Sequence, residues 1–156
     1  MILETRDAEP TYVLYVTYIL PDGISERKKD MEDEREKALD DLQQWMRVQT
    51  REGQVHVVCG DLNGWIGNRS TWNARRGFHT TLENSTRNTR GRWLRDLEDA
   101  LAWRLVNGYG PRCSGGPTHF GKQNDSVIDL VGVKTKHVKQ VVALAVGPRL
   151  TWSDHT

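Results

Sequence analysis

The sequence predicts an α/β fold in which mixed β-sheet is flanked by helices. Apolar residues recur at helical spacing in two segments, 26–50 and 89–103. Segments rich in β-branched and aromatic residues alternate with these helices early in the chain, and strands dominate later. The chain has 156 residues, the size of one ordinary domain. We therefore expect a single α/β sandwich with mixed sheets.

The first half of the chain predicts strand, helix and strand. Residues 11–20 are rich in Tyr, Val and Thr and precede the turn-forming sequence Pro21-Asp22-Gly23. The apolar stripe of the helix over 26–50 consists of Ala38, Leu39, Leu42, Trp45 and Met46. Gly53 follows, as expected after a helix end. A buried strand then ends at Asp61.

The second half begins with a polar loop that reaches about residue 88. The helix over 89–103 follows, with Leu94, Leu97 and Leu101 on its apolar stripe. Four further strands are predicted, at 104–106, 117–121, 126–133 and 137–146. We expect His56 and His137 to be structural residues on strands, and His79 and His119 to be solvated in loops.

Composition favours a globular protein of the cell interior. Apolar residues make up 37% of the chain and charged residues 28%, with a net charge of +1 and a mean hydropathy of -0.67. The two cysteines lack metal-binding spacing, which favours a reducing compartment. The longest apolar stretch, 12–20, is too short to span a bilayer, and no signal peptide is recognisable. We expect an intracellular location, nuclear or cytoplasmic, without membrane association.

Three short polar motifs follow apolar strand patterns. Asp61 and Asn63 end the sequence VHVVCGDLN, where an acid can accept a proton from water or hold a cation, and an amide can donate to a phosphate oxygen. Gly, Asp and Asn are also ordinary turn formers. Asp129 interrupts the apolar sequence SVIDLVGV, and Asp154-His155 joins a carboxylate to an imidazole that Asp129 can orient.

These motifs resemble those of the endonuclease/exonuclease/phosphatase superfamily of metal-dependent phosphoesterases. The resemblance rests on Gly60–Asn63, Ser126–Asp129, Ser153–His155 and Tyr18 before Pro21, in the family's order. Asn88–Leu94, Leu105–Gly108 and Thr118 resemble the branch found in non-LTR retroelement endonucleases. The resemblance implies a four-layer α/β sandwich that cleaves phosphodiesters with Mg²⁺ or Mn²⁺.

The resemblance also implies a role for each matching residue. Asp61 would activate or position the attacking water and share a cation, for which Asp154 would be a ligand, while Asn63 would hold a phosphate oxygen. His155 would contact the scissile phosphate, with its other ring nitrogen held by Asp129. The remaining implied residue is Tyr18, near the phosphate or the leaving group.

Members of this family begin with an Asn-bearing strand and a strand that carries a metal-binding glutamate, which the residues before Tyr12 are too few to form. We therefore expect residues 1–156 to be a single incomplete domain that lacks the N-terminal strands, with impaired activity. One sheet face would then be exposed and would favour self-association. The residues expected there are Val13, Val57, Ile128, Val131 and Val142.

An arginine-rich segment, 69–95, holds seven arginines and one acid, Glu83. It suggests a polyanionic substrate, with Arg69, Arg75 and Arg76 in contact with DNA or, alternatively, RNA. Our first hypothesis is a DNA-nicking endonuclease of the retroelement type. The alternative is a non-catalytic remnant that binds nucleic acid weakly, and a third, weaker option is a phosphatase acting on small molecules or lipids.

Overall fold

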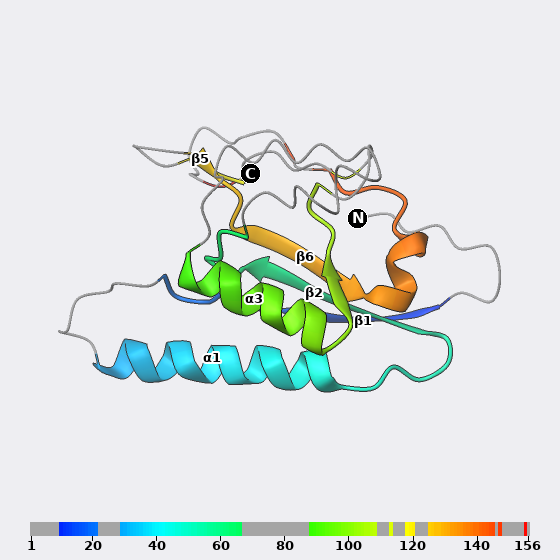
Figure 1. Ribbon diagram of the computed structural model, residues 1–156, viewed down its shortest axis with the longest axis horizontal. Coiled ribbons are helices and arrows are strands. Elements are labelled where there is room, and N and C mark those ends of the chain that lie inside the picture. Colours follow the sequence, from blue (N-terminus) through cyan, green and yellow to red (C-terminus); the bar gives the residue numbers. More distant parts are fainter. Residues whose placement is uncertain are drawn as a thin grey trace.

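The structure is a computed structural model of the whole chain. It describes the residues 10–21, 29–66, 88–108, 113, 118–120, 125–145, 147 and 155. In this part of the chain, four strands form one mixed sheet in the order β1-β2-β6-β3 (Figure 1). The strands are β1 (Thr11–Val16), β2 (Gln54–Asp61), β6 (Asp129–Lys134) and β3 (Trp103–Leu105). The α/β class expected from the sequence is confirmed.

The sheet is mixed because β1 runs parallel to β2, whereas β6 runs antiparallel to both β2 and β3. The parallel pair is connected through the helix α1 (Lys29–Arg47), as a parallel connection requires. A second helix, α3 (Thr89–Ala100), precedes β3. The predicted helices and the first three strands thus form within a few residues of their expected bounds.

Both helices pack on the same face of the sheet (Figure 1). Leu42 and Met46 of α1 and Leu94 and Leu97 of α3 meet Leu130 of β6 in one buried cluster. The indole of Trp103 is also buried there, and its Nε1 donates a hydrogen bond to the Met46 carbonyl at 2.7 Å. Apolar burial on this face is the main support of the sheet.

Among the described residues, those that cover the opposite face of the sheet include a 3₁₀ helix, η1 (Thr135–Gln140), and the segment after it. This helix places the buried Val138 against Val55, Val57 and Val133. The strand predicted over 137–146 is therefore wrong. Val138 belongs to a turn that crosses the sheet face, with the Val141 N–H bonded to the Val138 carbonyl at 3.2 Å.

The exposed apolar residues differ from those expected. Val57 is buried in the cluster that includes Val138 of η1, Ile128 is also buried, and Val13 is half-buried. Val131 is also half-buried, whereas Val142 is exposed. The exposed strand residues are instead Tyr12, Leu14 and Val16 of β1.

A short hairpin lies beside the sheet. Its strands are β4 (His119–Phe120) and β5 (Asp125–Ser126), and His119 pairs with Ser126. Within the described residues, no helix combines the length and apolar character needed to cross a membrane.

Candidate functional site

Two carboxylates lie directly opposite each other where β2 ends and β6 begins. Asp61 is the last residue of β2, Asp129 is the first residue of β6, and the ladder pairs them. Asp61 shares its sheet face with Val55 and Val57, because side chains alternate along a strand. The site therefore lies on the face opposite the helices.

Gly60 shapes the backbone just before Asp61. Its φ of +137° is a conformation that L side chains rarely adopt, and an added Cβ would lie 1.9 Å from the Thr17 carbonyl oxygen. Beyond this contact, the N–H of Ile19 bonds to the Asp61 carbonyl at 2.9 Å. Only glycine allows the end of β1 to approach the site so closely.

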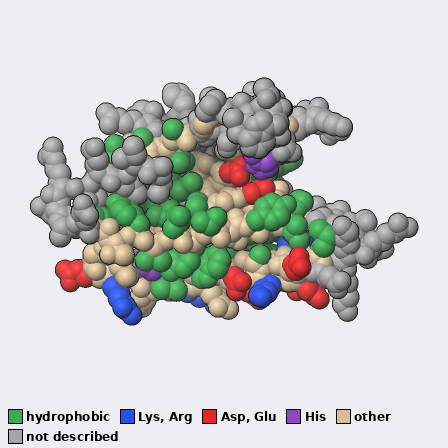
Figure 2. Space-filling model, turned by 180° about the vertical axis from the view of Figure 1, so that it is seen from behind, with side chains coloured by type: hydrophobic (Ala, Val, Ile, Leu, Met, Phe, Trp, Pro, Cys, Tyr) green, Lys and Arg blue, Asp and Glu red, His purple; other side chains and the backbone are tan. Residues whose placement is uncertain are grey.

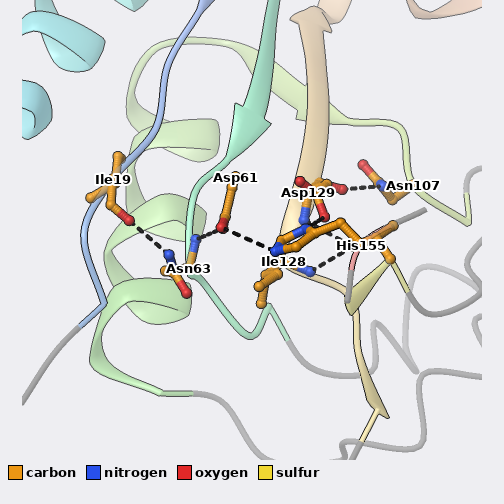
Figure 3. A network of polar contacts seen from close by, with 8 residues as sticks. Ile19, Asp61, Asn63, Asn107, Ile128, Asp129 and His155 are labelled. Carbon is orange, nitrogen blue, oxygen red and sulfur yellow. Dashed lines mark hydrogen bonds and ion pairs between the residues drawn. The ribbon is translucent and has the colours of Figure 1, made fainter. Parts of the chain in front are cut away.

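Asn63 fixes the turn after Asp61. Its backbone N–H donates to Asp61 Oδ1 at 2.9 Å, and its side-chain Nδ2 donates to the Ile19 carbonyl at 2.8 Å (Figure 3). Asn63 has a φ of 46°, a left-handed conformation that asparagine tolerates better than most residues. One carboxylate oxygen of Asp61 is thus held in place by the turn.

The imidazole of His155 lies between the two carboxylates. Its Nδ1 is 2.9 Å from Asp129 Oδ2, and its Nε2 is 4.0 Å from Asp61 Oδ2. Figure 3 shows the ring beside Asp61 and Asp129, with dashed contacts between these residues. An ionised carboxylate can only accept, so a bond from His155 to Asp129 places the proton on Nδ1 and leaves Nε2 facing Asp61.

Three potential ligand atoms, one each from Asp61, Asp129 and His155, lie within 4.8 Å of one another. Burial raises the pKa of Asp61, and the neighbouring charge of Asp129 raises it further. The Asn63 N–H, His155 and His119 act in the opposite direction. Carboxylate oxygens suit Mg²⁺ and Mn²⁺, and an imidazole nitrogen suits transition metals such as Mn²⁺, so this donor set fits a divalent cation.

Two buried polar residues hold the Asp129 backbone. The Thr118 hydroxyl accepts hydrogen bonds from the N–H groups of Ile128 and Asp129, at 3.2 and 3.0 Å. Asn107 donates to the Asp129 carbonyl at 3.0 Å and accepts from the Val131 N–H at 2.8 Å. Asn107 and Thr118 lie in segments on which the expected resemblance rests, and the structure shows that each bonds to the backbone around Asp129.

Asn88 connects the helix α3 to the loop after Asp61. Its Oδ1 accepts from the N–H groups of Gly91 and Trp65, at 2.7 and 3.0 Å, and its Nδ2 donates to the Asn63 carbonyl at 3.1 Å. Asn88 therefore caps α3 and holds the turn that carries Asn63. The site loop is built onto the N-terminus of a core helix.

His119 lies next to the site, so the expectation that it is solvated in a loop is wrong. It is half-buried in β4, and its ring centroid lies 5.1 Å from that of His155, edge to face. The backbones of His119 and His155 also form an antiparallel bridge. No local sequence signal indicates this contact, because His119 and His155 are 36 positions apart in the sequence.

The structure thus brings Asp61, Asn63, Asp129 and His155 together, as the sequence predicts. Tyr18 is 58% exposed and lies two residues beyond β1. The β1–β2 register, continued by two residues, places it beside Asp61 on the same face. The other predicted site residues lie outside the described part of the chain: Arg69, Arg75, Arg76 and Asp154.

Comparisons with protein-family models and with curated proteins find no match to this chain.

Proposed function

We propose that this chain is a metal-dependent phosphodiesterase that nicks DNA, of the retroelement type in the endonuclease/exonuclease/phosphatase superfamily. The observation that carries the proposal is the meeting of Asp61, Asp129 and His155, whose ligand atoms lie within 4.8 Å of one another. These residues come from three motifs, and the outermost two, Asp61 and His155, are 94 positions apart in the sequence. A structural role alone does not require two acids and an imidazole at one sheet edge.

The same proposal extends to the architecture. The sheet β1-β2-β6-β3, with α1 and α3 packed on one face, would be one sheet and one helical layer of a four-layer sandwich. Support comes from the position of the site at the end of β2, on the face opposite the helices. That face carries both the acids and the apolar residues of the second buried cluster.

The proposed cation is Mg²⁺ or Mn²⁺, held by Asp61, Asp129 and His155, with Asp154 as a further proposed ligand. When bound, the cation would neutralise phosphate charge and polarise a phosphoryl oxygen. Two acids opposite each other in a ladder repel, so a cation would also stabilise the edge where they lie. The raised pKa of Asp61 is consistent with a carboxylate that gains from a positive partner.

The chain's own residues would share the remaining chemistry. Asp129 orients the imidazole through Nδ1, so that Nε2 of His155 faces the space next to Asp61. There it would bind the cation when the ring is neutral, or donate a hydrogen bond to the phosphate when the ring is protonated. Asp61 would accept the proton of the attacking water or position that water. Asn63 positions Asp61 through its N–H, and Tyr18 lies on the same face.

DNA is the proposed substrate because of the arginine-rich segment 69–95, with Arg69, Arg75 and Arg76 as proposed phosphate contacts. RNA is the alternative polymer. Phosphate contacts position a nucleic acid but carry no base specificity, so no sequence preference follows from these arginines.

Nicking of supercoiled plasmid in the presence of Mg²⁺ or Mn²⁺ tests the proposal. Loss of a general acid or base lowers the rate by about 10²–10⁴-fold, so Asp61→Asn, Asp129→Asn and His155→Ala should each abolish detectable nicking. The matched controls are Asp99→Asn, an exposed acid paired with Arg104, and His137→Gln, a histidine bonded to Gln140. Nicking that these three site variants retain at the level of the controls would contradict the proposal.

The second candidate is a non-catalytic domain that binds nucleic acid weakly. It is favoured by one observation: one of the three potential ligand atoms that the described residues bring together is an imidazole nitrogen, whereas Mg²⁺ takes oxygen ligands. We therefore expect slow cleavage by the isolated chain. Binding of a labelled duplex without nicking under any cation would support this second candidate.

A further inference from the structure

His119 contacts His155 through its side chain and also through its backbone. The two ring centroids lie 5.1 Å apart with an angle of 66° between the ring planes, which is an edge-to-face arrangement. The backbones of the same two residues form an antiparallel bridge. Residues directly opposite each other in such a bridge present their side chains on one face, so the backbone pairing brings the two rings together.

The strand that carries His119 also pairs with the segment that leads to Asp129. In the hairpin of β4 and β5, His119 is paired with Ser126, which precedes β6. The Thr118 hydroxyl, just before His119, accepts a hydrogen bond from the Asp129 N–H at 3.0 Å. The segments that carry Asp129 and His155 are therefore both attached to the chain at His119.

His119 also lies close to the acids of the candidate site. Figure 2, which shows the molecule from behind the view of Figure 1, has histidine and acidic side chains side by side. Burial raises the pKa of Asp61, and the charge of His119 is one of the influences in the opposite direction. His119 thus belongs to the same cluster of side chains as Asp61, Asp129 and His155.

The bond from His155 to Asp129 does not by itself fix the direction of the imidazole. Nδ1 of His155 lies 2.9 Å from Asp129 Oδ2, and rotation about this single contact still moves Nε2. The χ2 torsion of a histidine is broad, so rotamer preference does not hold the ring either. An aromatic neighbour in edge-to-face contact restricts such rotation, because the contact is favourable only over a limited range of ring orientations.

We propose that His119 is a positioning residue of the candidate site, whose ring holds the His155 imidazole with Nε2 directed towards Asp61. This inference rests on the proposed function, because it assumes the role given there to His155. Any aromatic ring can make an edge-to-face contact, so position 119 requires a ring and not an imidazole nitrogen. His119 acts on the reaction only through His155.

Plasmid nicking with Mn²⁺ by three variants tests this role. His119→Ala removes the ring and should lower the rate by about 100-fold, the loss that a misplacement of about 1 Å can cause. His119→Phe keeps an aromatic edge and should restore most of the wild-type rate. The matched control is Phe120→Ala, which removes a ring from the adjacent residue of β4. Adjacent residues of a strand point to opposite faces, so this control should nick at close to the wild-type rate.

Three outcomes of the nicking assay would overturn the proposal. The first is a wild-type rate in His119→Ala. The second is a rate in His119→Phe as low as that in His119→Ala, because the imidazole itself would then be required. The third is an equal loss in His119→Ala and Phe120→Ala, which would assign the effect to the hairpin and not to the ring contact.

NMR spectroscopy tests the same contact without relying on activity. Long-range ¹H–¹⁵N correlation spectra in alkaline buffer, where the imidazoles are neutral, show which ring nitrogen carries the proton. The His155 signals are identified by their loss in His155→Ala. We expect the proton on Nδ1 in the wild type and in His119→Phe, and a mixture of both tautomers in His119→Ala.

An unchanged His155 tautomer in His119→Ala, or a wild-type proton on Nε2, would overturn the positioning role. If the tautomers behave as expected and the wild-type chain does not nick DNA, the ring contact stands and the proposed function fails. The two proposals therefore fail in different ways.

Discussion

The β2–β6 ladder has two regions with opposite chemistry on the same sheet face. Val57 pairs with Val133, and both are buried in an apolar cluster. Four residues further along β2, Asp61 pairs with Asp129. The valine pair stabilises the fold through burial, whereas two like charges directly opposite each other destabilise it. The two acids lower the stability of this end, and such local costs are expected at functional sites. The proposed cation would compensate for their repulsion.

The acidic end nevertheless has a rigid backbone. Thr118 and Asn107 bond to the main chain around Asp129, and Asn63 bonds to both Asp61 and Ile19. The unfavourable feature is thus limited to the carboxylates themselves. Substitutions that disturb the backbone should be costly at this end, and substitutions that remove charge should not.

The largest expected effect comes from Gly60 near the end of β2, and Gly53, which precedes β2, is its control. Gly60→Ala should destabilise the protein by about 3–5 kcal/mol, because it combines an unfavourable φ with a backbone clash against Thr17. Gly53→Ala also has a positive φ, +72°, but meets no atom within 4 Å, so its loss should be near 1 kcal/mol. Urea unfolding of both variants measures the difference. Equal losses of stability would mean that the Thr17 carbonyl does not pack closely against position 60.

The apolar end should respond to loss of volume. Val57 is 1% exposed, so Val57→Ala should lower the free energy of unfolding by about 2–3 kcal/mol through lost burial and a cavity. The control is Val16→Ala at the 65% exposed position of β1, with an expected change within about 0.5 kcal/mol. Similar losses from the two substitutions, measured by denaturant titration, would show that the ladder is not supported by its valine pair.

A smaller effect concerns His56, which is buried beside Tyr15 and Gln54. Desolvation lowers the pKa of His56 below 6.5, and the charges of Lys134, His137 and Lys136 lower it further. On acidification the unfolded chain therefore binds this proton first. The stabilising contribution is complete above pH 6.5 and is lost as the pH falls through the folded-state pKa.

Melting curves measured at a series of pH values check this prediction. The slope of stability against pH below 6.5 should decrease in His56→Gln. His137→Gln should decrease this slope independently of His56→Gln, because desolvation also lowers the pKa of His137. A slope unchanged in both variants would assign the acid sensitivity to other groups.

Much of the fold could be predicted because its signals are local. The apolar stripe with Leu42 and Met46 predicts α1, and the β-branched sequence before Gly60 predicts β2. The expected strand over 137–146 failed because Val138 is buried by a turn that crosses the sheet, and a β-branched residue gives the same signal in either setting. Strand order and register depend on distant pairings that no single segment encodes.

The candidate site likewise contains residues that could be predicted from local motifs and residues that could not. Asp61, Asp129 and His155 could be predicted because each lies in a short motif next to an apolar strand pattern. His119 could not, because its place beside His155 depends on a bridge between distant backbones. The fact that the Asn63 side chain also bonds to Ile19 is likewise visible only in the folded chain.

The most direct test of the central claim is one substitution, Asp61→Asn, measured in two ways. It removes one of two opposed charges and keeps the side chain's shape. In metal-free buffer we expect the free energy of unfolding to stay the same or rise by up to about 1 kcal/mol, while plasmid nicking with Mg²⁺ or Mn²⁺ is lost. A variant that is destabilised and still nicks DNA at the wild-type rate would contradict the account, because Asp61 would then be a structural residue.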